Sequence, residues 1–184
     1  MIRKCFEHLQ YCLEKDSQLR HLLVALESAG CPINFKRHIV CEEANDFSSF
    51  RGGFDASTKQ LVLFPDNIKT KNEFCTILKH ELIHAYDYCR VQINFNNIEH
   101  LACTEIRAAS LTECTLSDYF SMTFSPFLSG KHEYCVKRKA QQSLEICTNK
   151  RTVAKNEIDE TIKRVFKRCS NDTEPFNDKG AQMT

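Results

Sequence analysis

The stretch from His80 to His84 constrains the fold more than any other part of the chain, because on a helix it places two histidines one turn apart with a glutamate beside them. On a helix, side chains four residues apart have Cβ atoms about 5–6 Å from each other, so both histidines can reach one Zn²⁺. Glu81 lies about 100° round the helix from His80 and can hold the water that the metal activates. This His-Glu-x-x-His pattern is typical of zinc hydrolases. We predict His80 and His84 as metal ligands and Glu81 as the catalytic base.

The sequence around this pattern supports a helix. Thr70 and Glu73 form a Thr-x-x-Glu capping box, which is typical of a helix N-terminus. Apolar residues then recur with helical spacing. The pattern therefore predicts a helix of about twenty residues with the two histidines well inside it.

Length and composition favour one globular domain without a charged binding surface. The chain has 184 residues, a net charge of +1 and 27% charged residues. This balance argues against a nucleic-acid surface, and we expect no nucleic-acid partner. No stretch approaches the roughly 18 apolar residues of a membrane span, and residues 1–13 contain no apolar signal-peptide core. We expect neither a transmembrane span nor conventional secretion.

Eleven cysteines are too many for an average cytosolic protein. We expect disulfide bonds for most of them, with at least one thiol left unpaired or paired externally because the number is odd. A second, structural zinc site and simple core filling are the alternatives, although no Cys-x-x-Cys occurs. The mitochondrial intermembrane space would reconcile disulfide bonds with the missing signal peptide.

The periodicity predicts an α+β fold in which helices dominate. Two segments have strand character and are expected to pair antiparallel, with a turn at Gly52-Gly53 between them. Residues 120–130 are predicted as a loop, and the tail 171–184 as poorly ordered. The expected helices are 5–13, 17–29, 99–114, 132–147 and 153–169, and the expected strands are 33–41 and 60–64.

A catalytic zinc normally has three protein ligands, so a third must lie outside the pentapeptide. Glu105 is our first choice, because it follows His84 by 21 residues on a separate predicted helix. Asp87 and His100 stay open as alternatives. Asp87 would more commonly accept a hydrogen bond from the second ring nitrogen of a ligand histidine.

Longer motifs resemble a known family along nearly the whole chain. They are Cys5-x6-Cys12 and the segments 52–55 (GGFD), 80–87 (HELIHAYD), 100–109 (HLACTEIRAA) and 169–176 (CSNDTEPF). Together they resemble the "ATP twenty-three" family of mitochondrial inner membrane metalloproteases, which are also ATP synthase assembly factors. The chain departs from the family at Ala44 and Phe64, where cysteines are usual, while Cys75 and Cys147 are additional.

The resemblance implies a zincin-like metallopeptidase with a short antiparallel sheet beside the motif helix. Residues 1–170 would form a single domain with an N-terminal helical hairpin (1–30), a zincin core (31–115) and C-terminal helices (131–170). The protein would lie in the intermembrane space, peripherally on the inner membrane, after import by the oxidative import machinery. Its partners would be inner-membrane proteins, with ATP synthase subunit a as the expected substrate and assembly client.

The expected function is zinc-dependent peptide hydrolysis, with Zn²⁺ as cofactor. His132 or Tyr134 could stabilise the oxyanion. One alternative is an assembly chaperone or scaffold without proteolytic activity, in which the zinc site is structural. Another is a cytosolic zinc-binding scaffold with reduced thiols. The sequence does not separate these, because all of them retain His80 and His84.

Overall fold

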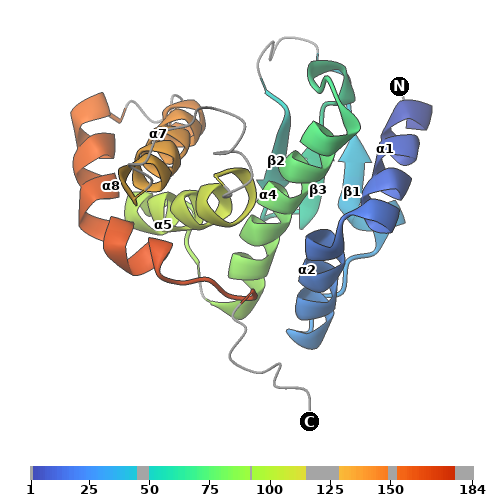
Figure 1. Ribbon diagram of the computed structural model, residues 1–184, viewed down its shortest axis with the longest axis horizontal. Helices are drawn as coiled ribbons and strands as arrows, with labels where there is room; N and C mark the ends of the chain where they lie inside the picture. The colour runs from blue at the N-terminus through green and yellow to red at the C-terminus, as the bar shows by residue number, and fades with distance from the viewer. Residues whose placement is uncertain (1, 45–49, 92, 115–128, 149–152, 177–184) are drawn as a thin grey trace. The chain divides into compact units, whose positions relative to one another are not determined.

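The computed structural model describes residues 2–44, 50–91, 93–114, 129–148 and 153–176 (Figure 1). These residues belong to two units. The first unit comprises the described residues from 2 to 91 and 174–176, and the second comprises those from 93 to 173. Most described residues are helical, and the strands form one small sheet. The predicted balance of helix and strand is therefore confirmed.

The first unit begins with two helices, α1 (Ile2–Lys15) and α2 (Ser17–Ser28), as the sequence predicts. Asp16 lies between them and caps α2, because its carboxylate accepts a hydrogen bond of 2.9 Å from the backbone N–H of Leu19. The chain leaves α2 through Gly30, whose φ of +84° suits a residue without a Cβ.

The sheet differs from the predicted one. It consists of β1 (Ile39–Cys41), β2 (Gly52–Asp55) and β3 (Gln60–Leu63), in the order β1-β3-β2. Strand β1 pairs with β3 in parallel, so the predicted antiparallel pairing of these segments is wrong. The antiparallel partner of β3 is β2, which contains the two glycines that we predicted as a turn. A two-residue glycine signal does not distinguish a turn from a strand that packs closely against a neighbour.

The predicted strand 33–41 is also shorter than expected. Its first part forms the single-turn helix α3 (Phe35–His38). Asn34 caps this helix, because its side-chain oxygen accepts hydrogen bonds from the backbone N–H groups of Lys36 and Arg37. A local side-chain cap of this kind competes successfully with β-propensity over so short a segment.

Helix α4 (Lys71–Arg90) is the long central helix of the first unit, and it crosses β2 and β3 (Figure 1). The predicted cap is confirmed, since the Thr70 hydroxyl accepts a hydrogen bond of 3.1 Å from the N–H of Glu73. The Glu73 carboxylate accepts from the N–H of Lys69 and from Arg51. Partial burial acts to raise the pKa of Glu73, but these hydrogen bonds lower it overall. A 3-10 turn, η1 (Pro65–Asn67), precedes the helix.

The second unit consists of helices α5 (Ile98–Ala108), α7 (Ser129–Thr148) and α8 (Lys155–Ser170). A π-helical turn, η2 (Ala109–Glu113), extends α5, so the predicted helix 99–114 is confirmed in outline. Helix α7 starts at Ser129, so Gly130 belongs to a helix rather than to the predicted loop. The rest of that loop, 120–128, lies outside the described residues. The core consists mainly of aliphatic residues from α5, α7 and α8.

Five cysteine pairs lie at disulfide distance. Three are in the first unit and two are in the second, so each unit is crosslinked by itself. The prediction of disulfide bonds for most cysteines is thus confirmed, and the additional Cys75 pairs with Cys12. Cys147 is exposed and lies outside these five pairs. The pairs are Cys5–Cys41, Cys12–Cys75, Cys31–Cys89, Cys103–Cys169 and Cys114–Cys135.

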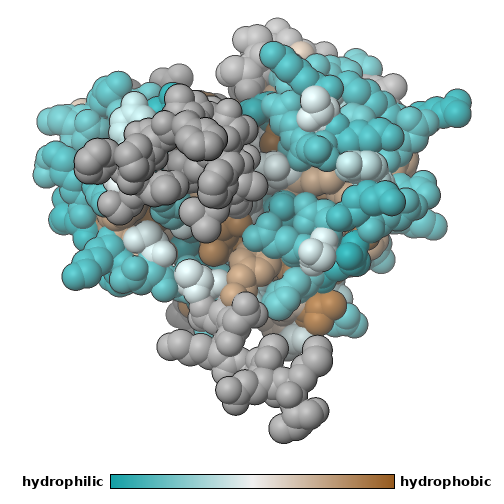
Figure 2. Space-filling model, viewed as in Figure 1, coloured by the Kyte–Doolittle hydropathy of each residue, from teal (hydrophilic) through white to brown (hydrophobic). Residues whose placement is uncertain are grey.

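The surface is largely hydrophilic in the view of Figure 2. No helix in the described part of the chain is both long and apolar enough to cross a membrane. Of the predicted tail, residues 171–176 are described, and 177–184 lie outside the described residues. Phe176 contacts the ring of His21, and the Pro175 carbonyl lies 3.0 Å from His21 Nε2.

Candidate metal centre

The two histidines of the motif lie one turn apart on α4, as predicted. The ring centroids of His80 and His84 are 4.8 Å apart, with an angle of 78° between the ring planes. A ring nitrogen of one lies within 4.8 Å of a ring nitrogen of the other, and both side chains are buried. Two imidazoles at this separation can bind one divalent ion with ordinary bond lengths of about 2.0–2.1 Å.

Glu81 is also buried, with 6% of the residue exposed. A bare carboxylate in such a place is costly unless hydrogen bonds or a cation compensate the lost hydration. One of its oxygens, Oε1, points toward β2 and would lie 3.3 Å from a Cβ atom added to Gly52. The carboxylate therefore lies in the space that the missing side chain of Gly52 leaves open.

The predicted third ligand, Glu105, belongs to the second unit. It lies in α5 and is buried, with 4% of the residue exposed. Arg107 lies two residues further along the same helix. The Arg107 guanidinium is itself buried and pairs with the carboxylate of Asp172, which follows α8.

The two alternative ligands have other contacts. Asp87 is buried on α4, and its Oδ1 accepts a hydrogen bond of 3.0 Å from Nε of Arg90. His100 is exposed in the first turn of α5, and its Nδ1 accepts a hydrogen bond of 3.1 Å from the N–H of Asn94. His100 and Glu105 are five residues apart, which places them about 140° from each other around the helix.

Two neighbours of the motif were missed by the sequence analysis. Lys79 directly precedes His80 and is buried, where its ammonium contacts Asp16 and Gln18, each at 2.8 Å. Gly52 was predicted in a turn that needs positive φ or close backbone approach, but not as a neighbour of Glu81. No sequence signal identifies Lys79, since its partners are about sixty residues away. Gly52 could have been found from the requirement for close approach that strand glycines often mark.

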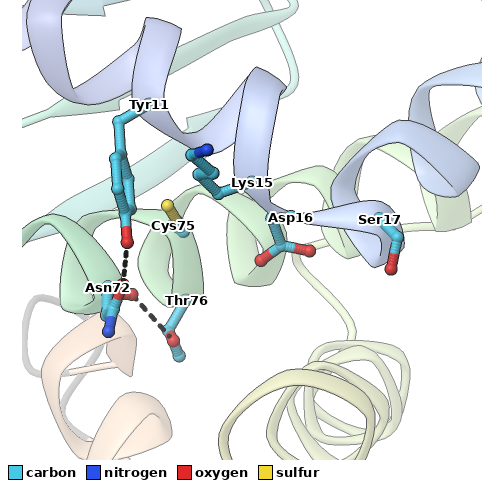
Figure 3. A pocket seen from close by; sticks show the side chains of 7 residues that line it. All are labelled: Tyr11, Lys15, Asp16, Ser17, Asn72, Cys75 and Thr76. Atoms are coloured by element: carbon cyan, nitrogen blue, oxygen red, sulfur yellow. Dashed lines mark hydrogen bonds between the residues drawn. The ribbon is translucent and has the colours of Figure 1, made fainter.

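A separate pocket of about 300 Å³ lies where the end of α1 and the start of α2 meet the first turns of α4 (Figure 3). Its lining is mostly polar and includes Tyr11, whose hydroxyl donates a hydrogen bond of 3.0 Å to Asn72. None of the motif residues lines it. The pocket therefore has no part in the candidate metal centre.

Comparison with known proteins decides the family. The model of the Peptidase M76 family matches residues 3–177. The chain belongs to the Peptidase M76 family. It is similar to the mitochondrial inner membrane protease ATP23 homologs of Homo sapiens and Xenopus laevis, with 41% and 40% identity. These matches cover 95% and 94% of this chain, and 69% and 72% of the two relatives.

A fungal relative, the mitochondrial inner membrane protease ATP23 of Meyerozyma guilliermondii, is 29% identical over 94% of this chain and 69% of its own. No solved structure matches the chain. The family membership confirms the resemblance that the sequence motifs indicated. It supports a peptidase, and a buried histidine pair is in keeping with a metal in such an enzyme.

Proposed function

We propose that this chain is a zinc-dependent endopeptidase of the His-Glu-x-x-His type with a zincin-like catalytic core. The main support is the buried histidine pair on α4, with Glu81 between the two histidines, in a chain of a peptidase family. Two imidazoles and a carboxylate are the donor set of a common class of catalytic zinc sites.

We propose Glu105 as the third ligand, completing a donor set with His80 and His84. A buried carboxylate gains most from a nearby cation, because burial removes its hydration. The competing Asp87 already interacts with Arg90, and His100 is exposed. We expect Glu105→Ala to lose stoichiometric zinc, and His100→Ala and Asp87→Asn to retain it. Loss of zinc in His100→Ala with retention in Glu105→Ala would contradict this choice.

The chain's own residues would carry the proton transfers. Bound zinc would supply a Lewis acid that polarises the scissile carbonyl and makes water more acidic. Glu81 accepts a proton from the attacking water and then delivers it to the leaving amine. Burial of Glu81 suits this role, because a carboxylate in a poorly solvated site does not have to lose bound water before it accepts the proton. His132 and Tyr134 remain predicted candidates for stabilising the oxyanion.

Glu81→Gln tests the function most directly. It keeps the shape of the side chain but cannot accept the proton, so zinc content should stay the same while peptide cleavage falls by orders of magnitude. The matched control is Glu14→Gln, the same change at an exposed position of α1. This variant should cleave at the parent rate. Cleavage by Glu81→Gln at the rate of the parent would show that Glu81 is not the base.

We further propose that the enzyme acts in the mitochondrial intermembrane space on proteins of the inner membrane, with peripheral attachment. The support is the similarity to relatives named mitochondrial inner membrane proteases and the five cysteine pairs, which require an oxidising compartment. Import would then use the oxidative import machinery. Alkylation of the native protein tests the redox state: eleven reactive thiols would contradict this compartment.

The proposed substrate and assembly client is ATP synthase subunit a. The alternative function, an assembly chaperone or scaffold with a structural zinc site, is separated from proteolysis by the same variant. Rescue of ATP synthase assembly by Glu81→Gln in cells that lack the parent protein would favour the chaperone. Failure to rescue, with normal levels of the variant, would favour a protease.

A further inference from the structure

At Gly52, strand β2 lies close against helix α4. A Cβ atom added to this residue would lie 2.9 Å from Cγ2 of Ile77 and 3.3 Å from Oε1 of Glu81. It would also lie 3.2 Å from Cδ2 of Leu63, the residue opposite Gly52 on β3. Carbon atoms in contact are normally about 3.5–4.0 Å apart, so even a methyl group does not fit without movement.

The requirement for glycine here comes from space rather than from backbone conformation. Among the described glycines, only Gly30 has a positive φ. Gly52 forms a regular antiparallel pair with Leu63, so any residue could adopt its backbone angles. What excludes a side chain is the surface of α4, where Ile77 and Glu81 lie on the same face because they are four residues apart.

We propose that Gly52 is a positioning residue for Glu81. Because Gly52 has no side chain, the Glu81 carboxylate has room beside it. A side chain at this position would displace the carboxylate from the position in which it accepts the proton. This inference depends on the proposed role of Glu81 as the base. A base must lie within about 2.6–3.2 Å of the atom whose proton it accepts, and an error of 1 Å can cost about a hundredfold in rate. The contact of 3.3 Å calls for a smaller shift of the carboxylate, so we expect a smaller loss.

The neighbouring glycine provides a matched control. Gly53 precedes Phe54 on the same strand, and successive residues of a strand point to opposite faces. A Cβ atom added to Gly53 would meet only the ring of Phe50, at 3.2 Å, and neither α4 nor Glu81. Gly53→Ala therefore makes the same chemical change in β2 without touching the carboxylate.

The first experiment compares Gly52→Ala and Gly53→Ala in peptide cleavage and zinc content. For Gly52→Ala we expect kcat to fall by up to about tenfold, with KM within about twofold and zinc unchanged. Gly53→Ala should keep the kcat of the parent. Parent kcat in a folded, zinc-loaded Gly52→Ala would overturn the proposal, and so would an equal fall in both variants.

A second variant separates positioning from simple overpacking. Leucine has no branch at Cβ, so Ile77→Leu removes the Cγ2 atom that a methyl group at Gly52 would meet most closely. We expect Gly52→Ala/Ile77→Leu to melt at a higher temperature than Gly52→Ala while kcat stays low, measured against Ile77→Leu alone. Recovery of kcat together with the melting temperature would show that the defect is one of packing, and would overturn the proposal.

A double-mutant cycle tests the contact without any activity measurement. Gly52→Ala is made in the parent and in Glu81→Ala, which removes the carboxylate, and the melting temperature of each protein is measured. The contacts with Ile77 are common to both backgrounds and cancel. The drop in melting temperature should be smaller in Glu81→Ala, whereas the drop for Gly53→Ala should be equal in both. Equal drops for Gly52→Ala would overturn the proposal, even if the parent proves to have no peptidase activity.

Discussion

The ammonium group of Lys79 lies 2.8 Å from a carboxylate oxygen of Asp16, in an ion pair that fixes α4 to the N-terminus of α2 one residue before His80. The two side chains are only 11% and 18% exposed. A pair so poorly solvated is stabilising only as long as both partners are present, because a single buried charge is strongly unfavourable.

We therefore predict that Lys79→Met lowers the free energy of unfolding by about 3 kcal/mol, measured by urea denaturation. Asp16 would be left partly buried without its ammonium partner. The control is Lys71→Met, which removes an exposed ammonium from the first turn of the same helix, where the Lys71 side chain lies over the ring of Tyr11. The control should lose less than about 1 kcal/mol. Equal losses would show that burial of the Lys79 pair has no special effect.

The second prediction concerns His8, which is buried on α1 with its ring edge-on to Phe74 at 5.2 Å. Its Nδ1 has no hydrogen-bond partner among the described residues. Burial lowers the pKa of His8 in the folded protein, and the charges of Lys4 and Lys71 lower this pKa further. Below the ordinary histidine pKa of about 6.5, the unfolded chain therefore binds a proton that the folded protein does not.

Stability should consequently fall as the pH drops below about 6.5, and the loss should end below the lowered pKa of the folded state. The contribution of this one group is at most about 1.4 kcal/mol per pH unit. Urea denaturation of the parent and His8→Leu from pH 7.5 to 4.5 measures it. The difference in unfolding free energy between the two proteins should shift in favour of His8→Leu as the pH falls; a constant difference would contradict the prediction.

The third prediction concerns the two disulfide bonds that hold the ends of α4. Cys12–Cys75 joins its first turns to α1, and Cys31–Cys89 joins its last turn to the segment after α2. They connect residues 63 and 58 positions apart, and closing loops of that size stabilises a fold by about 4 kcal/mol each in the chain-entropy view.

Replacing both cysteines of either pair by serine should lower the melting temperature clearly and reduce zinc affinity as well, because α4 carries both histidines that we propose as ligands. The comparison variant is Cys147→Ser, which alters an exposed cysteine outside the five pairs. It should change neither quantity. Zinc affinity that stays the same in both serine pairs would show that α4 keeps its ligand geometry without these crosslinks.

The fourth prediction concerns metal removal. A ligand that binds only the folded protein stabilises it by about 2.7 kcal/mol when its free concentration is a hundred times its dissociation constant. Dialysis against a chelator should therefore lower the melting temperature and abolish peptide cleavage, and added zinc should restore both. His84→Ala should melt at the same temperature with and without zinc, whereas His38→Ala should respond as the parent does. An unchanged melting temperature of the chelated parent would argue against a resident metal.

Local patterns in the chain were sufficient for most of the helices. The Thr70 cap and the apolar spacing placed α4 correctly. The segment between Asp16 and Gly30 forms a helix, as its sequence predicted. These signals are reliable because helix hydrogen bonds and caps join residues only three or four positions apart. The motif could be assigned to one turn of one helix for the same reason.

The sheet was predicted poorly, because strand pairing depends on residues far apart in the chain. The direction of β1 depends on its pairing with β3, and Gly52 as a strand residue packs closely against α4. No local pattern shows either contact. Cysteine pairing also depends on residues far apart in the chain. The number of cysteines predicts disulfide bonds, but which cysteines pair depends on which segments folding brings together.

The linear chain thus specifies where the chemical groups lie on their helices, including the one-turn spacing of His80 and His84. Their surroundings depend on folding in three dimensions: the Lys79 ion pair, the missing methyl group beside Glu81 and the burial of both histidines. The physical reason is that a helix forms through hydrogen bonds between near neighbours, whereas desolvation and close packing act only between segments that folding brings together.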